Sequence, residues 1–125
     1  MRRILIINDE KDIAIICGFV LEPFGYTVDF AHGGAEGVEC VRRLKPDLII
    51  LDWILPDMTG EDVLDQLRVS EATALIPVIL MSAIPDLDIQ AGRLGIQGFL
   101  NKPFDVDTLL DQVSKSLTPN RRAVA

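Results

Sequence analysis

The sequence predicts an α/β fold in which a parallel β-sheet lies between two layers of helices. Short apolar runs alternate with helical patterns at regular spacing along the 125 residues, which is the pattern of βαβ units. The run at residues 48–51 is continuously apolar, as expected for a central parallel strand that is buried on both faces. Polar side chains directly follow several of the runs. Such positions lie at the carboxyl edge of the sheet, where open α/β folds bind their ligands.

Five strands are expected, each a short run rich in apolar residues. They cover residues 3–8, 26–31, 47–52, 77–82 and 98–101. One helix is expected after each strand, and the five helices cover residues 11–21, 35–44, 60–69, 86–94 and 106–117. Right-handed crossovers between successive parallel strands then place helices on both faces of the sheet.

The expected helix ends coincide with residues that stop or start helices. Pro23 and Gly25 follow the first helix, Pro46 follows the second and Gly95 follows the fourth. Proline cannot donate the backbone hydrogen bond of a helix interior, and glycine readily adopts the left-handed conformation that closes a helix. Asp105 precedes the last helix as a suitable N-cap, because its carboxylate can accept hydrogen bonds from the first turn.

The first expected helix is unusually apolar. A helix that covers a sheet needs one apolar stripe, and we expect that stripe to consist of Ile13, Ile16, Cys17 and Val20. Ile15 and Phe19 then lie one turn apart on the exposed side. Two interpretations stay open, either scattered apolar side chains of a common kind or a docking patch for a partner.

Composition and charge narrow the class of protein. A chain of 125 residues with 49% hydrophobic and 25% charged residues is ordinary for one globular domain. Its net charge of −7 argues against a surface that binds nucleic acid. No apolar stretch approaches the roughly 20 residues of a membrane helix. The start of the chain runs straight into a strand, so no signal peptide is expected.

The two cysteines, Cys17 and Cys40, fall in expected helices without metal-binding or redox spacing. We therefore expect buried, reduced thiols in a cytoplasmic protein. Residues 1–118 form the expected domain, and residues 119–125 form a tail or the start of a linker.

Asp9, Asp52, Ser82 and Lys102 follow apolar runs at the expected carboxyl edge of the sheet. Two carboxylates about 4 Å apart repel by roughly 4 kcal/mol at an effective dielectric near 20. Such a pair is relieved by a cation, and Mg²⁺ takes carboxylate, phosphate and water oxygens. A lysine and a hydroxyl suit a phosphoryl group, and an aspartate can accept one as an acyl phosphate. Phosphoryl transfer needs little beyond this positioning and charge neutralisation.

Four motifs, in this order, resemble the receiver domain of two-component response regulators. They are Asn8-Asp9-Glu10, the segment 52–60, Ser82-Ala83 and Lys102-Pro103-Phe104. The resemblance covers residues 2 to about 117. It implies a flavodoxin-like, doubly wound fold with a five-stranded parallel sheet in the order 2-1-3-4-5 and five flanking helices. It also implies a signalling module that catalyses its own phosphorylation and dephosphorylation rather than a turnover enzyme.

The resemblance implies a phosphoacceptor with a metal beside it. Asp52 is the implied phosphoacceptor. Asp9, Asp52 and the backbone carbonyl of Ile54 are the implied ligands of Mg²⁺ or Mn²⁺. Asn8 stands where the family usually has a second acid, and its amide can hold a metal-bound water but adds no charge. We therefore expect weaker Mg²⁺ binding with phosphorylation retained.

The resemblance also implies how the phosphoryl group is held and sensed. Ser82, Lys102 and the backbone of Ala83 would bind it, and many receivers have a cis peptide bond before Pro103 that aims the lysine inward. Phe99 matches the aromatic switch position and would turn inward when Ser82 moves toward the phosphate.

Three further features modify these expectations. Ile54 and Ile84 are both apolar at positions that flank the path of hydrolytic water, so we expect a long-lived phosphorylated state. The segment 82–102 is about two residues shorter than in typical receivers, which predicts a short or loosely formed fourth helix. In this family the first helix contacts the phosphodonor, which favours a docking role for Ile15 and Phe19.

The expected partners are a histidine kinase or histidine phosphotransfer protein as donor and a downstream protein or effector domain. No nucleic acid or membrane partner is expected, and oligomeric state, kinase, pathway and output stay open. The alternative function is a pseudo-receiver, a protein-binding scaffold that is never phosphorylated. An aspartyl-nucleophile phosphatase would need an acid where Ile54 stands. A flavin carrier would need a hydroxyl- and glycine-rich loop in place of the acidic segment 8–12.

Overall fold

The computed structural model describes residues 2–96 and 98–117. Its sheet is parallel, with the strand order β2-β1-β3-β4-β5 that was expected. The strands are β1 (Arg3–Ile7), β2 (Thr27–Ala31), β3 (Leu48–Asp52), β4 (Val78–Ser82) and β5 (Gly98–Asn101). All five residues of β3 are buried, which confirms that the continuous apolar run marks the centre of the sheet.

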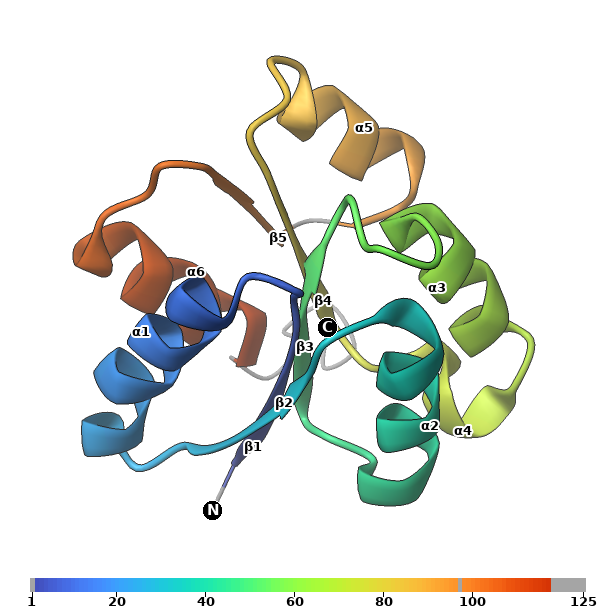
Figure 1. The fold of residues 1–125 in the computed structure, drawn as a ribbon, viewed down its shortest axis with the longest axis horizontal. Coiled ribbons are helices and arrows are strands. Elements are labelled where there is room, and N and C mark those ends of the chain that lie inside the picture. Colours follow the sequence, from blue (N-terminus) through green and yellow to red (C-terminus); the bar gives the residue numbers. More distant parts are fainter. Residues whose placement is uncertain (1, 97, 118–125) are drawn as a thin grey trace, which may run out of the picture.

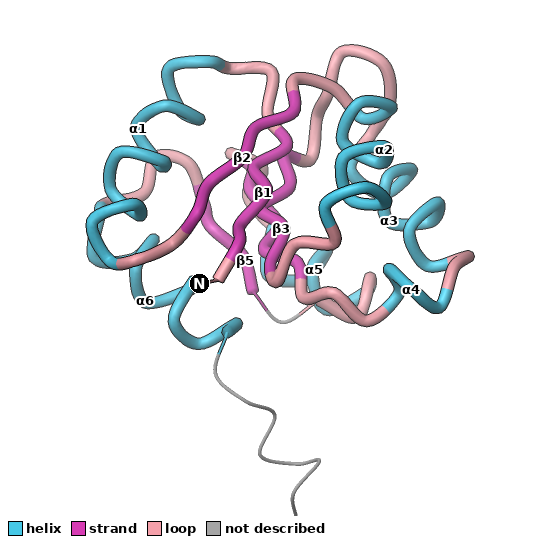
Figure 2. The backbone as a smooth tube through the Cα atoms, turned by 90° about the horizontal axis from the view of Figure 1, so that it is seen from below, coloured by secondary structure: helices cyan, strands magenta, loops and turns pink. Residues whose placement is uncertain are grey.

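Two layers of helices cover the sheet (Figure 1). The helices of the described chain are α1 (Lys11–Leu21), α2 (Gly34–Leu44), α3 (Gly60–Arg68), α4 (Glu71–Ala74), α5 (Leu87–Arg93) and α6 (Val106–Leu117). A 3₁₀ turn at Glu22–Phe24 extends α1. Helices α1 and α6 lie on one side of the sheet and α2, α3 and α5 on the other, as Figures 1 and 2 show.

Alternate residues of the central strands supply two separate cores. Ile49 and Leu51 of β3 pack with the side chains of α2, α3 and α5, whereas Leu48 and Ile50 pack with those of α1 and α6. The side chains of a strand point to opposite faces in turn, so a strand between two helix layers must be apolar at every position. This double burial anchors the end of β3.

The expectation of five helices was wrong by one, because the structure has the additional helix α4. Ser70 caps it by accepting a hydrogen bond from the backbone N–H of Ala72 at 3.3 Å. The Thr73 hydroxyl donates to the Leu67 carbonyl at 2.6 Å. Four residues are too few to show a helical period in the sequence. The expected short fourth helix is confirmed as α5, which has seven residues.

The expected buried stripe of α1 was wrong at one position, Ile16. Cys17 is buried, and Ile13 and Val20 are partly buried and pack against the core. The buried residues are Ala14, Cys17, Gly18 and Leu21, and Ile16 is 58% exposed. A Cβ atom on Gly18 would lie 2.9 Å from the Phe30 ring, so the small residues of α1 face β2 and allow close approach. When a helix is apolar nearly all round, its hydropathy pattern alone does not define the buried face.

Local signals at the helix ends are confirmed where the structure tests them. The Asp105 carboxylate accepts from the Thr108 N–H at 2.7 Å, as an N-cap should. Gly25 has a φ of 91° and Gly95 a φ of 75°, which lie in the left-handed region that favours glycine. None of the described helices combines the length and apolar character required to cross a bilayer. The expected tail at residues 119–125 lies outside the described residues.

Candidate functional site

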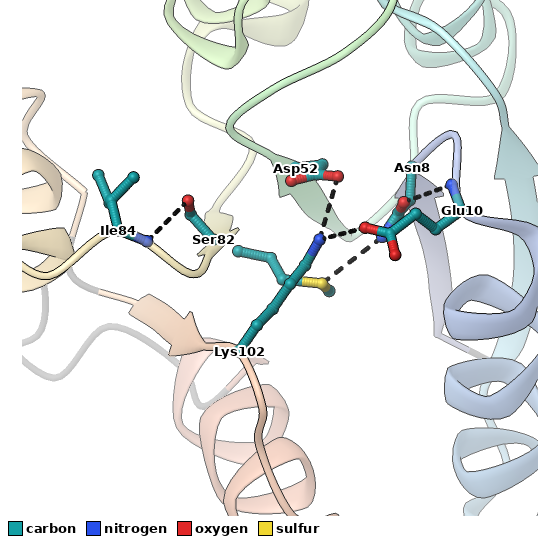
Figure 3. A network of polar contacts seen from close by, with 7 residues as sticks. Asn8, Glu10, Asp52, Ser82, Ile84 and Lys102 are labelled. Atoms are coloured by element: carbon teal, nitrogen blue, oxygen red, sulfur yellow. Dashed lines mark hydrogen bonds and ion pairs between the residues drawn. The ribbon is translucent and has the colours of Figure 1, made fainter.

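Asp52 lies at the carboxyl end of β3, at the centre of a cluster of polar side chains (Figure 3). Ser82 ends the neighbouring strand β4, and Lys102 directly follows β5. Asn8 directly follows β1, which pairs with β3 along the edge opposite to β4. The parallel register therefore brings these residues to one edge of the sheet, as the sequence predicted.

The Lys102 ammonium group is shared between two carboxylates. Its Nζ lies 2.8 Å from Glu10 Oε1 and 3.3 Å from Asp52 Oδ2, and Figure 3 shows the side chain reaching between them. The Glu10 side chain is about half exposed, whereas that of Asp52 is almost fully buried. The peptide bond between Lys102 and Pro103 is cis. Lys102 thus points into the site as expected, and its contact with Glu10 was not expected.

Burial raises the pKa of the Asp52 carboxyl above its ordinary value. The charge and hydrogen bond of Lys102 and a backbone hydrogen bond from Ile54 act in the opposite direction. Burial disfavours the charged form of Lys102, but its contacts with Glu10 and Asp52 outweigh this and raise the Lys102 pKa. The Asp52 carboxylate is therefore held in a place where its charge is costly and depends on one lysine.

Asn8 is fully buried, and both ends of its amide are engaged. Its Oδ1 accepts a hydrogen bond from the Glu10 N–H at 2.8 Å, and its Nδ2 approaches the Met81 sulfur at 3.6 Å. The amide therefore shapes the turn between β1 and α1, and its role in holding a metal-bound water stays a prediction.

Ser82 is buried, and its hydroxyl accepts a hydrogen bond from the Ile84 N–H at 3.3 Å. Figure 3 shows this hydroxyl directed toward Ile84 rather than toward Asp52. Phe99 is partly buried and packs against the core shared by α2, α3 and α5. Ala83, whose backbone was expected to bind the phosphoryl group, lies exposed beside Ser82.

The donor set at this edge fits a magnesium ion. Asp9 is exposed after β1 and Asp52 ends the neighbouring strand β3. The described residues hold no group of three or more acidic, histidine or cysteine side chains arranged around a metal. Magnesium does not require such a group, because it commonly takes one or two carboxylates and keeps several waters. The Ile54 backbone, whose carbonyl was the expected third ligand, lies in the loop that follows β3.

Asp57, in the loop that follows β3, caps α2 in a way the sequence did not indicate. Its two carboxylate oxygens accept hydrogen bonds from the N–H groups of Gly34, at 2.7 Å, and Ala35, at 2.9 Å. These hydrogen bonds lower the Asp57 pKa. The one available signal was the lack of a capping side chain at Gly33, the N-cap of α2.

The apolar residues expected around the site are accessible to different degrees. Ile54 is 66% exposed, and Ile84 is half-buried. On α1, Ile15 is 61% exposed and Phe19 is 80% exposed, and the misplaced Ile16 lies exposed beside them.

The sequence matches the family model of the response regulator receiver domain over residues 4–114. It is 41% identical over 90% of its length to the "DNA-binding dual master transcriptional regulator RpaA" of Synechocystis, of which it covers 48%. It is 34% identical over 92% of its length to "Sporulation initiation phosphotransferase F" of Bacillus subtilis, of which it covers 93%. The chain thus spans about half of the first relative and nearly all of the second.

Solved structures agree with the sequence relatives. The chemotaxis response regulator CheY4 of Vibrio cholerae has a TM-score of 0.86 and 26% identity, over 94% of this chain and 99% of that one. The receiver domain of a LuxO repressor protein from Vibrio parahaemolyticus has a TM-score of 0.84 and 32% identity, over 99% and 94%. With a family model that matches most of its length and relatives above 30% identity, the chain belongs to the response regulator receiver domain family.

Proposed function

We propose that this receiver domain is a magnesium-dependent phosphoacceptor in a cytoplasmic phosphorelay, with Asp52 as the acceptor. The observation that carries the proposal is the buried Asp52 carboxylate in contact with Lys102, with Asp9 following the adjacent strand. The donor is a phosphohistidine on a kinase or phosphotransfer protein. The recipient of the signal is a downstream protein or effector domain.

In the proposed reaction, an Asp52 oxygen attacks the phosphorus of the phosphohistidine. An O–P bond forms as the P–N bond breaks, and the electron pair stays on the imidazole nitrogen. Asp9, Asp52 and the Ile54 carbonyl would hold the metal, which neutralises charge on the phosphoryl oxygens when bound. Lys102 would shift from the Asp52 oxygen to a phosphoryl oxygen, and the backbone of Ala83 would donate to another.

The proposed switch begins at Ser82. Its hydroxyl would leave the Ile84 N–H and donate to a phosphoryl oxygen. Phe99, which is partly buried, would move inward into the space that this movement opens. The two positions of Ser82 form a two-state element that the phosphoryl group biases by binding one of them better.

The proposal is tested by beryllofluoride, which stands in for a phosphoryl group on an aspartate. Trp53 is partly buried next to Asp52, so its fluorescence should report binding. We expect a saturable change that requires Mg²⁺ and is absent in Asp52→Asn. If the native chain shows no change and a small-molecule phosphodonor does not label it, the pseudo-receiver is the better description.

A further inference from the structure

The first turn of α2 is capped from another part of the chain. Its N-cap residue, Gly33, has no side chain to satisfy the free N–H groups of the turn, and such groups need partners. The Asp57 carboxylate is their partner: one of its oxygens accepts a hydrogen bond from the Gly34 N–H and the other from the Ala35 N–H. The same turn is packed under the loop, because a Cβ atom on Gly34 would overlap the Met58 side chain.

Asp57 lies at the tip of the loop of residues 53–59, which leads directly from the phosphoacceptor strand to α3. Within the loop, the Leu55 N–H donates to the Met58 carbonyl at 3.2 Å, and Ile54 forms an isolated β-bridge with Thr59. These contacts close the loop into one unit. The other side of that unit lies beside the site, since Ile54 follows Asp52 by two residues and its backbone acts to lower the pKa of the Asp52 carboxyl.

We propose that Asp57 is a positioning residue, which anchors this loop to α2 and so holds the Ile54 backbone in place beside Asp52. The inference rests on the proposed function, in which the Ile54 carbonyl binds the metal. A loop fixed at its tip offers that carbonyl in one position, so little conformational freedom is lost when the metal and phosphoryl group bind. The contacts of α2 with the loop also make α2 sensitive to changes at Asp52.

A purely local role for Asp57 makes a different prediction. If the carboxylate serves only to cap α2, any other cap should replace it. Gly33 is already extended, with φ −157° and ψ 174°, which suits an N-cap serine. A Cβ atom at Gly33 would lie 3.2 Å from the Asp57 carboxylate, so Asp57→Ala makes room for that serine. The double variant Gly33→Ser/Asp57→Ala therefore restores a cap to α2 without restoring the anchor.

The experiment measures three quantities on the native chain, Asp57→Ala and the double variant. They are the urea midpoint, the beryllofluoride dissociation constant at saturating Mg²⁺, and amide hydrogen exchange in α2 and in the loop. We expect Asp57→Ala to lower the midpoint and to weaken beryllofluoride binding roughly 3- to 10-fold. In the double variant the midpoint and the protection of α2 should recover, while beryllofluoride binding stays weak and the loop stays unprotected. Ser70→Ala, which removes the cap of α4, controls for cap loss away from the site.

Recovery of beryllofluoride binding in the double variant would overturn the inference and leave Asp57 as a simple cap. Native-like binding in Asp57→Ala would overturn it as well. If the native chain binds no beryllofluoride, the proposed function fails and the exchange data alone decide about the anchor. Loss of loop protection in the double variant would then support the anchor, and unchanged protection would contradict it.

Discussion

At the scale of single residues, Asn8 is buried where the resemblance to receiver domains implies a second acid. Replacing it by aspartate adds a negative charge beside Asp9 and Asp52, which should tighten Mg²⁺ binding. The same change costs stability, because the carboxylate is fully buried and cannot donate toward Met81 as the amide does. We predict tighter Mg²⁺ binding in Asn8→Asp by fluorescence titration, together with a loss of roughly 1–3 kcal/mol in unfolding free energy without metal. Unchanged Mg²⁺ affinity would refute the expectation that Asn8 weakens the site.

Lys102 should affect how the free energy of unfolding depends on pH, because its charge lowers the pKa of Asp52. The Asp52 pKa is raised by burial and held down by Lys102, so Lys102→Met should raise it further. A carboxyl whose folded pKa lies above its unfolded value of about 3.9 loses stability as pH rises through the folded pKa. We therefore predict that Lys102→Met is less stable than the native chain by roughly 1–3 kcal/mol at pH 7, and that the deficit shrinks toward pH 5. Urea unfolding at both pH values tests this, and the deficit should lose its pH dependence in an Asp52→Asn background.

Ile54 and Ile84 should control how long the phosphorylated state lasts. Ile54 is exposed on one side of the site, and Ile84 is half-buried beside Ser82. Both are apolar and cannot orient an attacking water. We predict that Ile54→Asn combined with Ile84→Glu speeds the decay of labelled phosphate on Asp52. An unchanged decay rate would show that these side chains do not limit access of water.

At the scale of an element, α1 presents an apolar outer face to solvent. Ile15, Ile16 and Phe19 are each more than half exposed, and the helix follows the loop that carries Asp9. We predict that Phe19→Glu slows phosphoryl transfer from a phosphohistidine protein but not from a small-molecule donor. The comparison of the two rates separates docking from chemistry, and equal loss with both donors would indicate damage to the fold instead.

At the scale of the whole molecule, the two cores share one sheet and should unfold together. Cys17 belongs to the core under α1 and α6, and Cys40 to the core under α2, α3 and α5. Both thiols are free and buried, as the sequence predicted. Burial raises the Cys17 pKa to about 11 even though Lys102 lowers it, so its reactive thiolate is scarce in the folded state.

We predict that alkylation of the two thiols follows the same global opening. The single variant Cys17→Ala keeps Cys40 as its reporter thiol, and the single variant Cys40→Ala keeps Cys17. The rate of iodoacetamide labelling should increase in parallel for the two variants as the urea concentration rises. If Cys40 reacts fast and independently of urea, the α2 side opens locally, and the two cores are not one cooperative unit.

The sequence by itself determined the α/β class, the sites of the five strands and the edge where Asp52, Ser82 and Lys102 meet. These features follow from period, apolar runs and helix-stopping residues, which are local properties of the chain. It placed Ile15 and Phe19 on the exposed side of α1 but assigned Ile16 to the buried stripe, because an almost wholly apolar helix does not show where its buried face ends until Gly18 meets Phe30.

Only the tertiary structure decided which partners the polar groups take. Glu10 contacts Lys102, which also contacts Asp52, although 92 residues of chain separate Glu10 from Lys102. Asp57 accepts hydrogen bonds from Gly34 and Ala35 of α2, which precede it by 23 and 22 residues. No short-range pattern encodes such contacts, because they depend on the distances that the assembled sheet and helices set. The sequence thus specified the chemistry available at the site, and packing specified which groups contact one another there.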